Sequence, residues 1–421
     1  MAFNKLLVLI PTRNRAELAI NAVNSVLTQT DCNVEVIVSD NSTEEVELIS
    51  LKQFCEELQD ERLHYIKPPS PLPMSKHFNW ALEQTLQLSS ASHITILPDR
   101  WVFKPHALRE IVEIVNQYPE KILSYSWDSV DDERVPVKLL QAAWTGKLFE
   151  VKSSYLLDLA TQMSFTLPIL PAVLHVCVPR EVYHQVRQKY GTYFTSISPD
   201  YNFAYSSLTL VSSVIYYDKP LIVHYATARS QGISGMRGVP SRDALDFLKH
   251  YTPGRLSFDT PLPVIHLMTN AMLHEYCYVR QKSEASNLPD FDREKYLSAL
   301  TADVILFRDA KRKREMLLKL YKNYGMKFLK SYARAQIDQA RSKFPIRTRL
   351  RQALQKIALI KEPMNLQLEK RFDTTAEALD YNIRHPQKQN PSFENIEGWL
   401  GFNPLIEESN KVSVIDYEPH G

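Results

Sequence analysis

Residues 6–15 read LLVLIPTRNR and residues 34–42 read VEVIVSDNS, and these two stretches decide the fold class. Each is a short aliphatic or β-branched run that ends abruptly in polar residues. A run of this kind is typical of a strand covered on both faces of a parallel sheet. Apolar residues at helical spacing fill residues 15–28 between them. The opening of the chain is therefore predicted to be a βαβ unit.

The same alternation continues through the first half of the chain. Further strands are predicted at residues 63–66 and 93–97, and less regular ones at residues 122–127, 172–178 and 210–216. The helices between them are predicted over residues 44–58, 75–88, 105–117 and 181–190, and from residue 198 onward. Strands that alternate with helices in this rhythm indicate an α/β fold whose mostly parallel sheet is flanked by helices.

After about residue 240 the pattern changes and the chain is predicted to be mainly helical. We expect three parts: an α/β domain at 1–238, a strongly basic helical extension at 239–375, and a polar, loosely packed tail at 376–421. A length of 421 residues agrees with two or three structural units.

The composition excludes several classes of protein. Apolar residues make up 44% and charged residues 23% of the chain, which is ordinary globular usage. Four widely spaced cysteines argue against a zinc ribbon or a disulfide scaffold and fit a reducing compartment. The apolar run near the N-terminus is too short for a signal peptide, and no stretch approaches the ~20 apolar residues of a membrane span. We therefore expect a cytoplasmic protein.

Polar residues follow three of the predicted strands directly, at 12–15, 40–42 and 99–101. Parallel sheets bind ligands in the crevice beyond the carboxyl ends of their strands, so these clusters are candidates for one binding site. Arg13 and Arg15 also stand at the start of a predicted helix, where positive charge opposes the helix dipole. Two arginines there point to an anion nearby.

These motifs resemble the opening of family 2 glycosyltransferases. The resemblance rests on VLIPTRNR, on IVSDNS and on the helix SKHFNWAL at residues 75–82, and it extends over about residues 4–230. It implies a GT-A fold, which is a nucleotide-binding α/β domain. It further implies an inverting glycosyltransferase that moves a sugar from a nucleotide-diphosphate donor to an acceptor hydroxyl, in polysaccharide or glycan assembly.

The resemblance assigns Asp40, with its neighbour Asn41, to recognition of the nucleoside. Thr12 and Arg13 would face the ribose and the diphosphate, because arginine suits bidentate contact with phosphate. Lys76 could equally be an ordinary solvent-facing lysine. The complete predicted donor site comprises Pro11, Thr12, Arg13, Arg15, Asp40, Asn41, Lys76, Asn79, Asp99 and Arg100.

Members of the family carry an Asp-x-Asp motif that holds a divalent cation, but here the corresponding stretch is Asp99-Arg100-Trp101. We expect Mn²⁺ or Mg²⁺ to be held by Asp99, with His224 as a second ligand, since Mg²⁺ often uses only one or two carboxylates. Two alternatives stay open. Arg100 could neutralise the diphosphate without a metal, and His224 could be a buried structural histidine. The incomplete motif also keeps open a catalytically inactive nucleotide-sugar-binding protein of the same fold.

The resemblance places the catalytic base near the start of a late helix, and Asp200 in the stretch Ser-Pro-Asp-Tyr-Asn is the matching residue. A carboxylate in reach of the acceptor hydroxyl can take its proton. The alternative is that Asp200 only caps the helix, as aspartate commonly does.

Residues 311–361 hold sixteen basic and two acidic residues, a net charge of +14, which leaves −12 for the rest of the chain. Three interpretations compete for this amphipathic segment. It lies on an anionic membrane surface, as suits a peripheral enzyme with a lipid-linked rather than a free glycan acceptor. It packs as a solvated helical face on the acidic remainder. Or it binds nucleic acid, which we do not expect because no nucleic-acid-binding module is recognisable.

Overall fold

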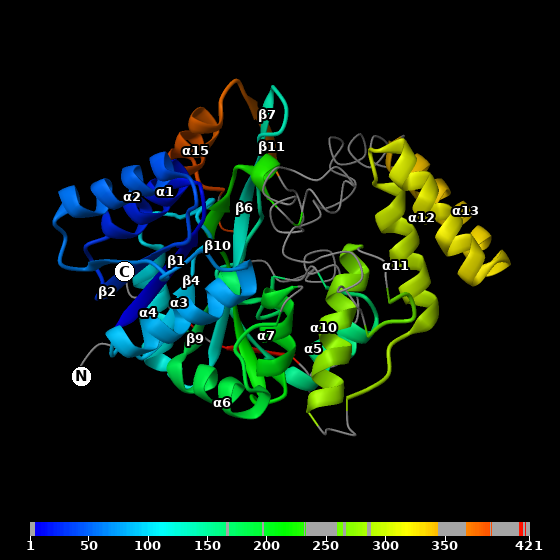
Figure 1. Ribbon diagram of the computed structural model, residues 1–421, viewed down its shortest axis with the longest axis horizontal. Coiled ribbons are helices and arrows are strands. Elements are labelled where there is room, and N and C mark those ends of the chain that lie inside the picture. The colour runs from blue at the N-terminus through cyan, green and yellow to red at the C-terminus, as the bar shows by residue number, and fades with distance from the viewer. Residues whose placement is uncertain are drawn as a thin grey trace.

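The computed structural model describes residues 5–165, 168–195, 198–230, 232, 259–263, 267–283, 288–343, 368–387, 389, 412–415 and 417. Within these residues a twelve-stranded sheet forms the body of the N-terminal part, and a group of helices lies beside it (Figure 1). Both features confirm the fold class expected from the alternating pattern.

Seven strands make the centre of the sheet. They follow one another in the order β3 (Leu63–Ile66), β2 (Val34–Asp40), β1 (Leu6–Thr12), β4 (His93–Ile96), β9 (Val176–Pro179), β6 (Ile122–Asp131) and β10 (Ser213–His224). β9 is antiparallel to both of its neighbours, and all other neighbours in this set are parallel. Six strands therefore run in one direction, and their carboxyl ends meet at one edge.

Five shorter strands extend the sheet. They are β5 (Trp101–Phe103), β7 (Val137–Gln141), β8 (Leu148–Lys152), β11 (Leu368–Phe372) and β12 (Val412–Ile415). β5 pairs with the end of β10, and β8 pairs with the start of β10. β11 pairs with β7, and β12 pairs with β8, so two strands from the far end of the chain complete the sheet.

Alternation along β1 explains why helices cover both faces of the sheet. Leu6, Val8 and Ile10 pack in one hydrophobic cluster with α1 (Ala16–Leu27), α2 (Glu45–Leu58) and α4 (Ala107–Gln117). Leu7 and Leu9 point the other way and join a second cluster. The helices of that cluster are α3 (Met74–Leu88), α5 (Ser153–Thr161), α6 (Arg180–Tyr190) and α7 (Pro199–Leu208). Side chains alternate along a strand, so these two clusters together bury both faces of β1.

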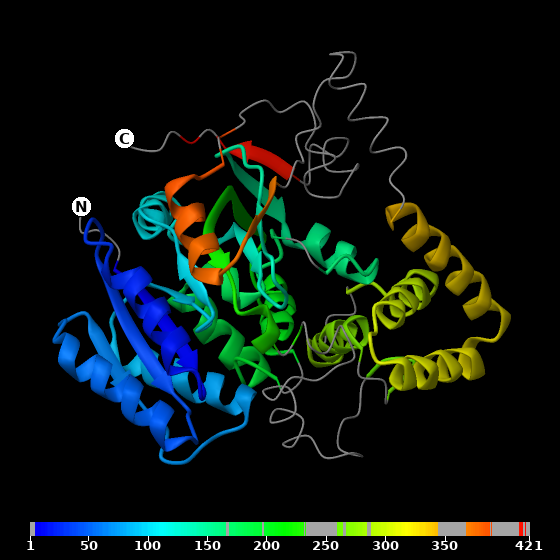
Figure 2. The same cartoon turned by 90° about the horizontal axis from the view of Figure 1, so that it is seen from above.

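The helical part continues the second cluster rather than forming a core of its own. It consists of α10 (Met268–Lys282), α11 (Arg293–Ile305), α12 (Ala310–Tyr324) and α13 (Met326–Lys343). Tyr205 of α7 and Tyr276 of α10 meet edge to face with ring centroids 5.5 Å apart, and both are fully buried. α12 and α13 lie on the side of α11 away from the sheet (Figures 1 and 2).

The C-terminal segment packs more closely than the expected loose tail. After β11 the helix α15 (Thr375–Arg384) lies against β7, as Figure 1 shows, and Asn382 is completely buried there. The Nδ2 atom of Asn382 donates to Oδ2 of Asp128 on β6 at 2.7 Å. The described residues of this segment are held through hydrogen bonds and strand pairing rather than through a large apolar face.

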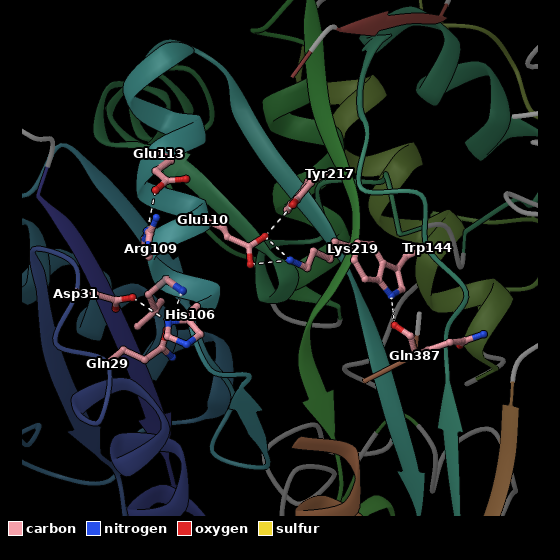
Figure 3. Close-up of polar contacts among 11 residues, drawn as sticks. Gln29, Asp31, His106, Arg109, Glu110, Glu113, Trp144, Tyr217, Lys219 and Gln387 are labelled. Atoms are coloured by element: carbon pink, nitrogen blue, oxygen red, sulfur yellow. Dashed lines mark hydrogen bonds and ion pairs between the residues drawn. The ribbon is translucent and has the colours of Figure 1, made fainter. Parts of the chain in front are cut away.

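A second set of contacts joins α4, β10 and this segment (Figure 3). Glu110 of α4 accepts hydrogen bonds from the Lys219 ammonium at 2.7 and 2.8 Å and from the Tyr217 hydroxyl at 2.7 Å. The same ammonium lies 5.0 Å from the centroid of the Trp144 ring, a cation–π contact. The indole N–H of Trp144 in turn donates to the Gln387 carbonyl at 2.8 Å.

None of the helices described is both long and apolar enough to cross a membrane. The four cysteines are free in the structure.

We predict that Asn382→Ala lowers the free energy of unfolding by about 1–3 kcal/mol, because it leaves the buried Asp128 carboxylate short of one hydrogen bond. Chemical denaturation followed by circular dichroism measures the change. The control is Asp380→Ala on the same helix, which removes only an exposed ion pair with Arg384 and is expected to change stability by less than about 0.5 kcal/mol. Equal effects of the two substitutions would contradict the docking described here.

Candidate active site

The carboxyl edge of the sheet brings the first predicted residues together. Thr12 and Asp40 end β1 and β2 and are direct partners in the register of these strands. The Thr12 hydroxyl donates to Oδ2 of Asp99, just after β4, at 2.8 Å, and Asp99 is only 3% exposed. Pro11 is buried in the same strand end. Three neighbouring strands thus present their terminal polar groups at one place.

Asp40 is fixed in orientation before any ligand arrives. Its Oδ1 accepts from the backbone N–H of Ser42 at 2.8 Å, and its Oδ2 accepts from the Tyr65 hydroxyl at 2.9 Å. Burial and the nearby Asp40 carboxylate raise the pKa of Tyr65 far above its ordinary value, so the hydroxyl stays a donor. Sequence reasoning missed Tyr65, although its place in the third strand, beside β2, was a usable signal.

Arg13 and Asn41 hold a loop against this edge. Arg13 Nη1 and Asn41 Nδ2 both donate to the Leu72 carbonyl, at 3.0 and 2.8 Å, and Asn41 Oδ1 accepts from the Leu72 N–H at 2.8 Å. The proline-rich loop before α3 is thereby fastened to the ends of β1 and β2. In this arrangement the Asn41 amide serves the loop through both its oxygen and its nitrogen.

Asn79 differs from its predicted role in donor binding. Its Nδ2 donates to the carbonyls of Ser75 and Phe194, at 2.8 and 2.9 Å. Its Oδ1 accepts from the Thr192 hydroxyl and from the N–H groups of Tyr193 and Phe194. These hydrogen bonds hold the segment after α6. They occupy both the nitrogen and the oxygen of the Asn79 amide, which in this arrangement does not point to contact with a nucleotide sugar.

Lys76 lies one turn earlier on α3 and is exposed. No hydrogen bond or ion pair described in the structure joins it to the carboxyl edge. α3 begins at that edge, because His77 Nε2 lies 2.8 Å from the Ser39 hydroxyl, so a role of Lys76 in the site stays a prediction.

Arginines supply the positive charge of the site. Arg15 Nη1 lies 3.1 Å from Oδ1 of Asp99, and its Nη2 donates to the Arg229 carbonyl at 2.8 Å. Arg229 Nη2 donates to the Asn14 carbonyl at 2.8 Å, which ties the turn η2 (Thr227–Arg229) to the loop after β1. Asp132 orders that turn by accepting from the Thr227 N–H and hydroxyl, each at 2.8 Å.

Arg100 is the unusual member of this group. Its Nη1 atom is buried and has no hydrogen-bond partner among the residues described. Burial lowers the pKa of the guanidinium to about 10, against the opposing effect of carboxylates that include Asp99, Asp132 and Asp200. It stays charged at neutral pH, and a buried, charged donor without a partner is rare in proteins. This atom is therefore suited to receive an anionic ligand.

His224 stacks between two tryptophans. Its ring lies 3.7 Å from that of Trp101 with 20° between the planes, and 5.2 Å from that of Trp127 with 6° between the planes. Burial, followed by the charge of Arg100, lowers the pKa of His224 well below its ordinary value, so the ring is neutral. Its buried Nε2 has no partner among the described residues.

The predicted metal ligands Asp99 and His224 have other neighbours in this arrangement. Both oxygens of Asp99 are already engaged, one by the Thr12 hydroxyl and the other by the Arg15 guanidinium. Within the described part of the chain, no group of three or more histidine, cysteine, aspartate or glutamate side chains is placed to hold a metal ion. The charged neighbours of Asp99 are the arginines Arg15 and Arg100 rather than a second carboxylate.

Asp200 is the second residue of α7 and is partly exposed. Burial of its carboxyl raises the pKa to about 6, while the backbone amides of Asp200 and Tyr201 and the charge of Arg100 act in the opposite direction. The cap position of α7 is Ser198, so Asp200 does not occupy it. A carboxylate with a pKa near 6 is well matched to accepting a proton at neutral pH.

Glu275 of α10 was not predicted, and it contacts the segment that precedes Asp200. It is completely buried, accepts from the Thr195 hydroxyl, and accepts from the Ser198 N–H at 2.7 Å. Burial, aided by the charge of Asp200, raises the pKa of Glu275 to about 7. A glutamate among the buried positions of a helix was the available sequence signal. The helical part thus positions the segment that leads into α7.

Part of the chain matches a known protein family. Residues 7–167 match glycosyl transferase family 2. The resemblance expected from the strand-end motifs is therefore confirmed over these residues, which include every predicted donor-site residue from Pro11 to Arg100. No curated protein matches the chain.

The chain is also similar to solved structures of S. aureus TarS. The structure of residues 1–349 shares 15% sequence identity, with a TM-score of 0.42 and coverage of 80% of this chain and 92% of that one. The same fragment in complex with UDP-GlcNAc shares 14% identity, with the same coverage and TM-score. Longer TarS shares 15% identity, with a TM-score of 0.41 and coverage of 78% and 54%.

The boundary expected at residue 238 lies outside the described part of the chain, which in this region covers residues 198–230 and residue 232. The three-part division therefore stays a prediction.

We predict that Glu275→Gln makes stability less dependent on pH. The pKa of Glu275 is raised in the folded state. Its contribution to the free energy of unfolding is therefore full below the unfolded pKa near 4.5 and is lost as the pH rises through about 7. Between pH 5 and pH 8 the unfolding free energy of the unaltered protein should fall by about 1–3 kcal/mol relative to that of the variant. Urea denaturation at both pH values measures this, and identical slopes for the two proteins would refute it.

Proposed function

We propose that this chain is an inverting glycosyltransferase that transfers a sugar from a nucleoside-diphosphate donor to an acceptor hydroxyl. The observation that carries the proposal is the pairing of Arg100, a buried cation with an unpartnered Nη1, with Asp200, a carboxylate whose pKa is raised to about 6. One group suits the negative charge of a leaving diphosphate, and the other suits the proton of an attacking hydroxyl. The family match over residues 7–167 supports the same chemistry.

In the proposed reaction each group has a separate task. Asp40, held by Tyr65 and Ser42, accepts a hydrogen bond from the nucleobase. Asp200 takes the proton of the acceptor hydroxyl as its oxygen forms the bond to the anomeric carbon. The bond from that carbon to the diphosphate breaks on the opposite face, its electron pair leaves with the diphosphate, and the configuration inverts. Arg100 and Arg15 stabilise the charge that develops there.

We further propose that arginines, rather than a metal, neutralise the leaving group. Asp99 is committed to Thr12 and Arg15, and its salt bridge to Arg15 fixes a cation at the strand ends. The alternative is the expected Mn²⁺ or Mg²⁺ ion on Asp99 and His224. The two proposals give opposite results with a chelator.

The acceptor belongs to the finer part of the proposal. We propose a glycan or a lipid-linked acceptor, in polysaccharide or glycan assembly. The second candidate function is a nucleotide-sugar-binding protein without catalysis, which the missing second carboxylate of the Asp-x-Asp motif favours. Slow hydrolysis of a nucleotide sugar by the unaltered protein would decide for the enzyme, since a competent site transfers some sugar to water.

Asp200→Asn is expected to keep donor binding and to lower turnover by about 10²–10⁴-fold, because the amide cannot accept the proton. Donor hydrolysis or transfer measures turnover, and calorimetry with a nucleotide sugar measures binding. In the unaltered enzyme kcat/KM should fall as the pH drops below about 6, where the Asp200 carboxylate becomes protonated. The matched control is Asp292→Asn, at the N-cap of α11, where asparagine caps equally well. Turnover retained in Asp200→Asn would discard the assignment.

Arg100→Ala is expected to lower turnover by about 10²-fold or more, because it removes a preorganised cation from the developing charge. Arg100→Lys should recover part of the loss. EDTA should leave the activity of the unaltered enzyme unchanged. Arg371→Ala, an exposed arginine on β11, serves as the control. The metal alternative gains instead if EDTA abolishes activity, Mn²⁺ restores it and Arg100→Ala stays active.

A further inference from the structure

The outer sides of α12 and α13 carry an apolar stripe that is exposed in the described part of the chain. The α12–α13 face is defined here by five exposed side chains: Leu318, Tyr321, Met326, Leu329 and Ile337. Their exposed fractions lie between 41% and 66%. Within each helix neighbouring positions of this set are three or eight residues apart, so they lie on one side of that helix.

The opposite sides of the same two helices are buried. Leu320 and Phe328 belong to the hydrophobic core that also contains Leu300 and Val304 of α11. Each of these two helices therefore buries one apolar stripe in the core and exposes a second one. The residues of the second stripe do not belong to the buried core of the described chain.

Basic residues border this face on both helices. Residues 310–337 contain nine lysines and arginines and one glutamate, a net charge of +8. The side chains beside the apolar stripe that are exposed are Lys311, Arg314, Lys322, Lys327, Lys330 and Arg334. Because these six side chains are exposed, they are not buried against the described remainder of the chain. Their charge is available to an external partner.

We propose that the α12–α13 face binds an anionic phospholipid surface. Interfacial helices combine a buried apolar stripe with flanking lysines and arginines, whose charge complements that of acidic headgroups. Nucleic acid would engage the basic residues through its phosphates, but it offers nothing to five exposed apolar side chains. The inference does not rest on the proposed transferase activity, because its test measures binding alone.

The test is co-sedimentation of the full-length protein with lipid vesicles. One set is pure phosphatidylcholine, and the other contains about one third phosphatidylserine, which gives the surface its negative charge. The protein should bind only the anionic set, and binding should weaken by about tenfold or more when salt is raised from about 0.05 to about 0.5 M. Equal binding to both sets, or binding to neither, would overturn the proposal.

Two triple variants separate charge from apolar contact. Lys322→Glu, Lys327→Glu and Lys330→Glu together, and Leu318→Ser, Met326→Ser and Leu329→Ser together, should each weaken vesicle binding by about tenfold or more. The matched control is Val46→Ser, Ile49→Ser and Leu88→Ser, three exposed apolar residues on α2 and α3, which should bind like the unaltered protein.

Thermal melting checks that each variant folds. If the charge variant fails to fold, the serine variant alone decides, because its residues are exposed. Full vesicle binding by a folded serine variant would refute the proposal. So would tight binding to a short DNA or RNA duplex without binding to vesicles.

Discussion

The hydrogen bond between Thr12 and Asp99 is the contact on which the candidate site depends. It joins the ends of β1 and β4, and both groups are buried. Arg15 meets the other oxygen of the same carboxylate and reaches on to the carbonyl of Arg229, at the end of the domain's last turn. Residues more than two hundred positions apart are thereby fixed around one carboxylate, which can do this only because parallel strands end at a common edge.

Charge balance explains why Arg100 can exist where it does. A buried guanidinium is unfavourable by itself, but carboxylates that include Asp99, Asp132 and Asp200 surround it. The same arrangement acts on Asp200, whose pKa the cation lowers while burial raises it. Arg100, proposed to stabilise the leaving diphosphate, and Asp200, proposed to accept the proton, thus influence each other's pKa. Glu275 extends this system into the helical part.

Local patterns predicted the strands and helices of the first half because apolar periodicity reports burial directly. They predicted the strand-end site because direction and order of parallel strands fix where their ends meet. The reversed direction of β9 was not predictable, since its short apolar run carries no sign of orientation. Glu275 was missed, and the contacts of Asn79 were not foreseen, because their partners, Ser198 and Phe194, are far away in sequence. Composition likewise could not show that residues 368–387 return to the sheet.

The return of β11 and β12 has a consequence for biosynthesis. β8 and β7 leave the ribosome more than two hundred residues before the strands that pair with them. During that interval their backbone amides and carbonyls form open edges, which are sites for unwanted strand pairing between chains. A chain arrested before residue 368 would leave β7 without its β11 partner. Residues 368–372 and 412–415 therefore cover strand edges that would otherwise be open to pairing between chains.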